Sequence, residues 1–256
     1  HVEGAGSVLD LPTLDHIEAS LDSVTHIQVY GGGQLKLGAL KELVTGTLVM
    51  DVSGEGTKFE LPQLTEIRGR QALGVSGGAQ VTLPSLRRFV QGSTSGWYWL
   101  TADGVGTMID CPVLELFEGN LDSATIIRAS NAGRVRLQHL PRIVTGTVQI
   151  SSDGIGSLVD LSSLMLFQDP GRRSRIAASN GGLVALPAGI QLDGVQLDGV
   201  TPGLVFPVAP IITQQPEDLV VAPNAAALFT IVAEGTAPIA YQWQRELFPG
   251  NWVDLA

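Results

Sequence analysis

The fold is decided by the stretch GVGTMIDCPVLELF, residues 104–117, because near-copies of it recur at a fixed spacing. The copies are GAGSVLDLPTLDHI (4–17), GEGTKFELPQLTEI (54–67) and GIGSLVDLSSLMLF (154–167). Each of the four segments starts 50 residues after the one before it. Self-similarity at a fixed period is typical of solenoids, in which a repeat buries its apolar face only against its neighbours.

Four shorter relatives lie between these copies, so about eight coils follow one another between residues 4 and 190. They are GGQLKLGALKEL (32–43), GGAQVTLPSLRRF (77–89), AGRVRLQHLPRI (132–143) and GGLVALP (181–187). When the eight segments are aligned, apolar residues form four columns, which we expect to face inward as ladders of like side chains. The columns are Leu9, Leu35, Phe59, Val81, Ile109, Val135, Val159 and Val184; Leu11, Leu37, Leu61, Leu83, Cys111, Leu137, Leu161 and Leu186; Leu14, Leu40, Leu64, Leu86, Leu114, Leu140 and Leu164; and Ile17, Leu43, Ile67, Phe89, Phe117, Ile143 and Phe167.

The alternation of apolar and polar residues within each coil predicts a short strand with one buried face. A coil of roughly 22–28 residues fits both a parallel β-helix and a leucine-rich-repeat horseshoe. Glycine-rich turns and the lack of any sustained helical periodicity favour the β-helix. The sequence therefore predicts an all-β fold, a right-handed parallel β-helix of about eight coils built on a 50-residue double-coil repeat.

A polar column alternates in charge on the outer face of the predicted strands. It comprises Asp10, Lys36, Glu60, Thr82, Asp110, Arg136, Asp160 and Ala185. Adjacent strands lie about 4.8 Å apart, so opposite charges become neighbours in a charge ladder worth about 0.5 kcal/mol per pair. The alternative interpretation is a row of catalytic carboxylates about 9–10 Å apart, with Asp110 and Asp160 lining a cleft. The bases between the acids favour the charge ladder.

Two tryptophans depart from the repeat in the third strand of the double coil. The aligned strands are TGTLVMDVSG (45–54), SGWYWLTADG (95–104) and TGTVQISSDG (145–154). Tyr98 aligns with apolar residues of the sister strands and is expected to face inward, so Trp97 and Trp99 face outward, about 6.5–7 Å apart. Such a pair could stack against sugar rings as a carbohydrate-binding platform, which Tyr30 could extend. The alternative is that the loop 90–96 or a neighbouring domain covers both indoles.

The composition and charge exclude several classes of site. The net charge of −10 and the pI near 4.7 argue against nucleic acid and anionic membranes as partners, and no apolar run is long enough for membrane insertion. The four histidines share no ligand spacing, so no metal site is expected; calcium at the Asp-Gly turns at 103 and 153 is retained only as an alternative. No nucleophile motif occurs, and no cofactor is expected.

The repeat pattern ends after Pro187. We expect residues 1–190 to form the β-helix, residues 191–208 a cap or linker, and residues 209–256 a second domain.

The second domain contains Pro210-x-Ile212, Gln215-Pro216, the strand Ala227–Ala233, Gly235-Thr-Ala-Pro238 and Tyr241-Gln-Trp243-Gln. Through these motifs it resembles bacterial immunoglobulin-like domains. Trp243 takes the place of the core tryptophan on the third strand of such folds, and about half of the sandwich is present. The resemblance implies a partial immunoglobulin-like β-sandwich that serves as a spacer or display module in a large secreted or surface-attached protein.

The repeat region is also similar to parallel β-helix modules of secreted bacterial proteins, which include adhesins, polysaccharide lyases and hydrolases, and carbohydrate-binding modules. This similarity implies an extracellular or cell-surface location. The sequence favours a non-catalytic module that binds a polysaccharide or cell-surface glycan through Trp97, Trp99 and Tyr30, beside further domains of the same chain. The alternatives are a structural or adhesive stalk and, secondly, a polysaccharide lyase or glycoside hydrolase of the β-helix type.

Overall fold

The structure is a computed structural model that describes residues 1–19, 22–44, 46–91, 98–204, 211–214, 216, 219–220, 228–234, 240–248 and 250–254. These residues form strands and turns, and none of their segments is a helix long and apolar enough to cross a membrane. The chain divides into two compact units, residues 1–204 and 205–256.

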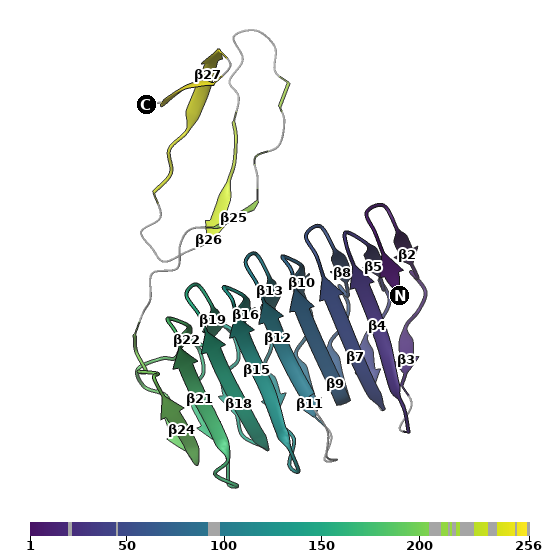
Figure 1. Ribbon diagram of the computed structural model, residues 1–256, viewed down its shortest axis with the longest axis vertical. Helices are drawn as coiled ribbons and strands as arrows, with labels where there is room; N and C mark the ends of the chain where they lie inside the picture. Colours follow the sequence, from purple (N-terminus) through teal and green to yellow (C-terminus); the bar gives the residue numbers. More distant parts are fainter. Residues whose placement is uncertain are drawn as a thin grey trace. The chain divides into compact units, whose positions relative to one another are not determined.

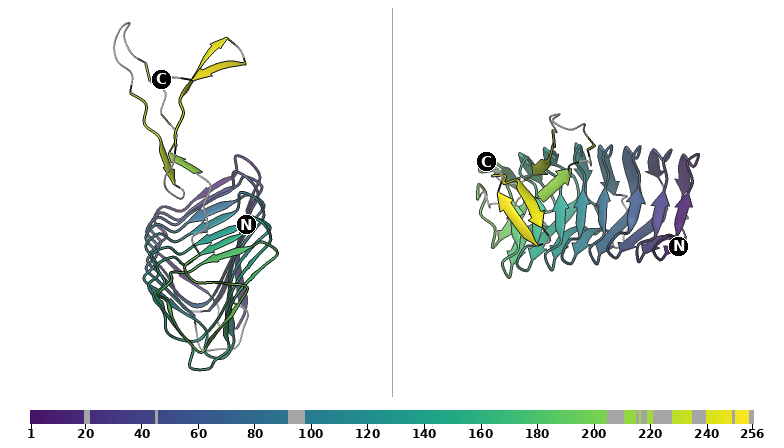
Figure 2. Two further views of the ribbon diagram at one scale, coloured as in Figure 1. Left: turned by 90° about the vertical axis from the view of Figure 1, so that its left-hand side faces the viewer. Right: turned by 90° about the horizontal axis from the view of Figure 1, so that it is seen from above.

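The first unit is a parallel β-solenoid of about eight coils, and its coils follow one another in sequence order along the axis (Figures 1 and 2). Each coil contributes one strand to each of three parallel stacks. Stack A contains β1 (Val2–Glu3), β4 (Val24–Tyr30), β7 (Thr47–Ser53), β9 (Glu66–Ser76), β12 (Tyr98–Asp103), β15 (Ala124–Ser130), β18 (Thr147–Asp153), β21 (Ser174–Ser179) and β24 (Val195–Asp198). Stack B contains β2 (Val8–Asp10), β5 (Gln34–Lys36), β8 (Lys58–Glu60), β10 (Gln80–Thr82), β13 (Met108–Asp110), β16 (Arg134–Arg136), β19 (Leu158–Asp160) and β22 (Leu183–Ala185).

Stack C is joined to stack A by one long strand. It contains β3 (His16–Glu18), β6 (Glu42–Val44), β11 (Arg88–Gln91), β14 (Leu116–Glu118), β17 (Arg142–Ile143), β20 (Leu166–Gln168) and β23 (Gln191–Asp193), together with the first half of β9. The second half of β9 belongs to stack A, so the third coil passes from one stack to the other without a loop.

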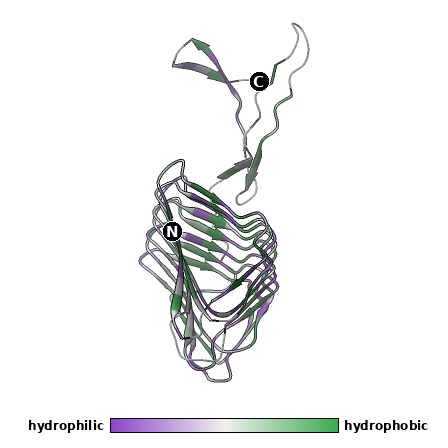
Figure 3. Cartoon of the chain, turned by 90° about the vertical axis from the view of Figure 1, so that its right-hand side faces the viewer, coloured by the Kyte–Doolittle hydropathy of each residue, from purple (hydrophilic) through white to green (hydrophobic). Residues whose placement is uncertain are grey.

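The predicted apolar columns form the core. From the second coil onward every member of the four columns is buried, and the Phe89 and Phe117 rings stack with their centroids 5.0 Å apart. Cys111 fills its leucine column as expected, and this burial, followed by the nearby Asp110 charge, raises the pKa of its thiol far above the usual range. Figure 3 shows hydrophilic and hydrophobic segments alternating along the strands, as expected for coils with one buried face.

The first coil departs from the predicted burial. Leu9 and Leu11 are 41% and 37% exposed, although both belong to inward columns. Among the described strands β2 pairs only with β5, so one side of these two residues is not covered by another strand of stack B.

One hydroxyl in each double coil explains why Ser or Thr follows Gly-x-Gly in three of the four long copies, those that begin at residues 54, 104 and 154. The Thr57 hydroxyl donates to Ser53 O (2.7 Å) and accepts from the Gly32 backbone N–H (2.9 Å) in the preceding coil. Thr107 and Ser157 make the same two bonds, with Asp103 O and Gly78 N, and with Asp153 O and Ala132 N. The hydroxyl therefore ties each turn to the coil before it, and this is a physical basis for the period of two coils.

At the other end, the segment expected to be a cap continues the stacks. Strand β23 pairs with β20, and β24 pairs with β21, so residues 191–198 add strands to stacks C and A. The first compact unit ends at Leu204.

The second unit contains two separate antiparallel strand pairs among its described residues. Strand β25 (Ile211–Gln214) pairs with β26 (Val232–Glu234), and β27 (Gln244–Phe248) pairs with β28 (Asn251–Asp254). Trp243 is 39% exposed, with its ring centroid 6.3 Å from that of Phe229. Residues 210, 215, 227 and 235–238, which carried part of the immunoglobulin-like resemblance, lie outside the described residues. A β-sandwich is not confirmed.

Candidate functional site

Trp99 faces outward from β12, as its place in the sequence pattern predicts. Its neighbours Tyr98 and Leu100 are each 1% exposed and point into the core, whereas Trp99 itself is half-buried. Trp97, its proposed partner in the aromatic pair, lies outside the described residues, so its orientation stays a prediction.

Beside Trp99, stack A has an outward position without a side chain. Gly74 on β9 is the register partner of Asp51 on β7 and of Thr101 on β12, so three consecutive coils meet there. A Cβ atom placed on Gly74 would lie 3.3 Å from Asp51 Oδ1, 3.6 Å from Trp99 Nε1 and 3.7 Å from Thr101 Oγ1. We call the set Asp51, Gly74, Trp99 and Thr101 the Gly74 site. It brings a carboxylate, an indole N–H and a hydroxyl close around one strand position that has no side chain.

Tyr30 lies on the same outer face but away from Trp99. Its column runs through Ser53 and Ser76 to Asp103, which is four residues beyond Trp99 on β12. Three strand spacings and four residue rises put the two backbones roughly 20 Å apart.

Tyr30 has its own local environment at the edge of this face. Its ring meets the His1 ring edge to face, with centroids 5.7 Å apart. Burial, and then the charge of Asp51, raises the pKa of the Tyr30 hydroxyl. Tyr30 and Trp99 therefore flank Asp51 from two sides and do not form one contiguous stack.

Asp110 and Asp160, two of the outward acids of stack B, are engaged with the strand between them. Asp110 Oδ2 lies 3.7 Å from Arg136 Nη1, and Arg136 Nη2 donates to Gln138 Oε1 at 3.1 Å. Gln138 Nε2 in turn donates to Asp160 Oδ2 at 2.7 Å, and Asp160 is 6% exposed. The two carboxylates named as candidate catalytic acids thus share one polar network, as the charge-ladder interpretation expects.

The aspartates of the two Asp-Gly turns accept hydrogen bonds from the following coil. Asp153 Oδ1 accepts from Ser179 Oγ (2.6 Å) and Asn180 Nδ2 (2.7 Å), and these bonds lower the pKa of Asp153. Asp103 Oδ1 is bonded in the same way by Ser130 and Asn131. Among the residues that the structure describes, no three His, Cys, Asp or Glu side chains lie together as metal ligands would.

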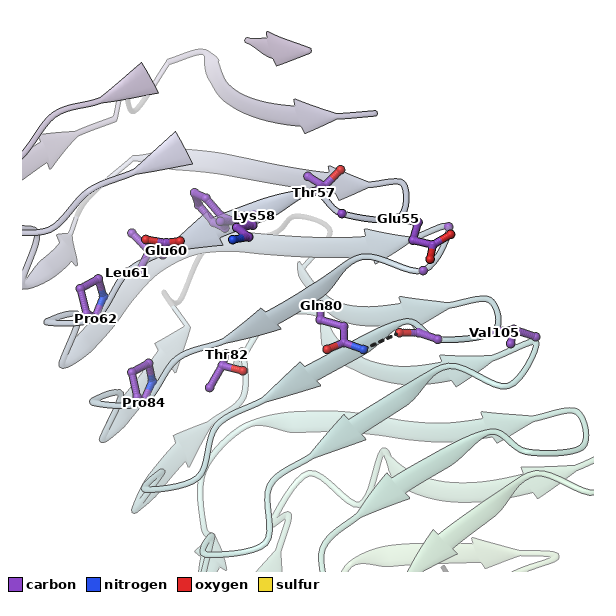
Figure 4. Close-up of a pocket in the computed structure, with 15 residues that line it drawn as sticks. Glu55, Thr57, Lys58, Glu60, Leu61, Pro62, Gln80, Thr82, Pro84 and Val105 are labelled. Atoms are coloured by element: carbon purple, nitrogen blue, oxygen red, sulfur yellow. Dashed lines mark hydrogen bonds between the residues drawn. The ribbon is translucent and has the colours of Figure 1, made fainter. Parts of the chain in front are cut away.

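Sequence reasoning missed a groove of about 920 Å³ on the outer face of stack B (Figure 4). It runs between β8 and β10, from the turns at Glu55 and Val105 to the prolines Pro62 and Pro84. A signal was present in the sequence, because Phe59 and Val81 are only 22 residues apart, the shortest interval in their column.

No protein-family model, no curated protein and no solved structure matches this chain.

Proposed function

We propose that the first unit is a non-catalytic module that binds a polysaccharide or a cell-surface glycan at the Gly74 site. The observation that carries the proposal is the convergence of an indole, a carboxylate and a hydroxyl on a strand position that has no side chain. Sugar rings present C–H faces that pack on aromatic rings, and hydroxyls that both donate and accept hydrogen bonds. Asp51 Oδ1 accepts, Trp99 Nε1 donates and Thr101 Oγ1 does both.

The hydrogen-bonding capacity of this site is available to a ligand. Within the described part of the chain, the side chains of Asp51, Trp99 and Thr101 are engaged in no hydrogen bond or ion pair with other protein groups. Trp99 remains partly accessible, and the lack of a Gly74 side chain lets another group come close to the backbone beside the three polar atoms. In this proposal Trp97 widens the aromatic surface. Tyr30 contacts only a ligand long enough to extend from Trp99 across Asp51.

The wider setting of the proposal is a multidomain protein of the cell surface or the extracellular space. The second unit then serves as an immunoglobulin-like spacer or display module beside further domains of the same chain. The acidic surface is compatible with a neutral or cationic glycan, because like charge disfavours a polyanion.

Electrophoresis through gels that contain plant or algal polysaccharides tests the proposal. We expect at least one polysaccharide to retard the native protein and the Trp99→Ala variant to migrate as it does in a plain gel. Gln149→Ala is the matched control, because Gln149 occupies the same outward column two coils further on. Equal retardation of Trp99→Ala and the native protein would contradict the proposal.

A structural or adhesive stalk is the second candidate. It is favoured by the parallel stacks, whose strand pairs continue from the first coil to the last. If no glycan retards the native protein, this function becomes the better account of the solenoid.

A further inference from the structure

The groove on stack B coincides with a local opening of the sheet. Strands β8 and β10 are in register at one position, Gln80 with Lys58, whereas each of the other neighbouring pairs in stack B has three register positions. The Leu37 N–H donates to Glu60 O, and the Leu83 N–H donates to Asp110 O. The equivalent bond from the Leu61 N–H to Thr82 O is absent, although both residues are described.

The opening therefore leaves one backbone donor and one backbone acceptor of the groove lining without their usual partners. Leu61 is buried, and its N–H lacks the acceptor that the corresponding residue has in the other coils. Buried backbone groups are normally paired, and an unpaired one adjoining a cavity is a position for water or a ligand.

The side chains along the groove carry both signs of charge. Lys58 and Glu60 are exposed on the same face of β8, and neither takes part in an ion pair within the described part of the chain. Across the opening, Gln80 and Thr82 are exposed on β10, and Gln80 Nε2 donates to Gly106 O at 3.3 Å (Figure 4). The lining offers no exposed aromatic ring, because Phe59 is only 3% exposed.

We infer that this groove binds an extended peptide segment. Peptides that dock on sheets use backbone hydrogen bonds for affinity and alternate side chains for specificity. The Leu61 N–H and Thr82 C=O supply the backbone partners at the open end of the groove. Lys58 and Glu60 are two residues apart on one strand, roughly 6.5–7 Å, which is the spacing of alternate side chains in an extended peptide. A glycan is the less favoured occupant, because the groove has no aromatic face.

The ligand chemistry follows from the two charges. An acidic residue of the peptide meets Lys58, and a basic residue two positions away meets Glu60. We therefore expect the groove to distinguish the order Glu-x-Lys from the order Lys-x-Glu in peptides of the same composition.

Fluorescence anisotropy with two labelled peptides, GTETKTG and GTKTETG, tests the inference. We expect the native protein to prefer one order by about tenfold, and the charge-swapped variant Lys58→Glu/Glu60→Lys to prefer the other by a similar factor. The control Arg87→Glu/Glu115→Arg exchanges an exposed ion pair outside the groove and should leave the preference unchanged. Binding of neither peptide, or a preference that the swap does not reverse, would overturn the inference.

Amide hydrogen exchange gives a second readout that does not require a variant. The Leu61 amide should exchange faster than the Leu37 and Leu83 amides in the free protein, and it should become protected when the preferred peptide is added. A gluco-oligosaccharide that protects the Leu61 amide while both peptides fail to do so would show that the occupant is a glycan, against the inference. Both readouts concern stack B, whereas the Gly74 site lies on stack A, so their failure leaves the proposed function untouched.

Discussion

Trp99 and Gly74 lie on neighbouring strands, with the indole Nε1 3.6 Å from the point where a Gly74 side chain would begin. Both residues depart from the repeat. Trp99 is an outward tryptophan on its coil, and Gly74 leaves the preceding coil without an outward side chain at this position. Asp51 and Thr101 complete the site from the same column as Gly74. An aromatic ring beside a strand position that has no side chain and three polar neighbours is the geometry on which the proposed function rests.

Substitutions of Thr107 test whether the repeated hydroxyl stabilises the solenoid by bonding each turn to the preceding coil. Replacing Thr107 with valine keeps the volume but leaves Gly78 N and Asp103 O without their partner, so we expect a loss of about 1–3 kcal/mol in the free energy of unfolding. Thr107→Ser retains the hydroxyl that Ser157 uses in the sister repeat, and it should cost much less. Urea unfolding followed by circular dichroism measures both. Equal destabilisation by the two variants would contradict a stabilising role of this hydroxyl.

Asp169 should make the stability of the solenoid sensitive to acid. Burial raises the pKa of its carboxyl, but hydrogen bonds from the Ser174 hydroxyl and from the backbone N–H groups of Arg173, Ser174 and Gly171 outweigh burial and leave the pKa lowered. A carboxyl whose pKa is lower in the folded state stabilises that state above its unfolded pKa of about 3.9. The contribution is lost as the pH falls through the folded-state value.

The measurement compares Asp169→Asn with the native protein in urea unfolding at pH 7 and at low pH. We expect Asp169→Asn to lose about 1–3 kcal/mol at pH 7, because an amide group would face donors that now meet a carboxylate. The difference should shrink below the folded-state pKa. Asp15→Asn, on an exposed turn, is the control. A difference that stays constant with pH would show that the charge of Asp169 is not what stabilises this loop.

Cys111 should be inert in the folded protein. Its side chain is 1% exposed and the pKa of its thiol is raised, so a thiol reagent such as dithionitrobenzoate should react only after unfolding. Cys111→Leu introduces the residue that fills this column in the other coils, but it adds volume to a packed core, so it should lower the free energy of unfolding by about 1–3 kcal/mol. Rapid labelling of the folded protein would contradict the burial of this column.

The repeat made the fold predictable because the core columns are apolar in every coil and their spacing is regular. From Leu35, Leu37, Leu40 and Leu43 onward, the aligned positions are the buried positions, since a parallel stack brings equivalent residues into register. The inward direction of Tyr98 followed from the same alignment.

The outer surface was less predictable because it does not repeat. The Gly74 site depends on three different residues at one column position, and the repeat of the strands at 45–54, 95–104 and 145–154 does not include the second half of β9. The opening between β8 and β10 depends on missing backbone hydrogen bonds, which side-chain patterns do not encode. The short interval from Phe59 to Val81 was the one sequence signal for it. Both the Gly74 site and the groove lie where the structure departs from the regular repeat.

The most direct test of the central claim is to add a methyl group at Gly74 without altering any polar group. Gly74 has no positive φ, and an alanine Cβ would lie at ordinary contact distance from Trp99 and Thr101. Only the Asp51 carboxylate, at 3.3 Å, would have to move by a few tenths of an ångström, so Gly74→Ala should fold. Ser151→Ala is the matched control, because Ser151 lies in the same outward column. In affinity electrophoresis with the polysaccharide that retards the native protein, the account predicts that Gly74→Ala loses most of the retardation and that Ser151→Ala keeps it. Full retardation of a folded Gly74→Ala variant would contradict the account.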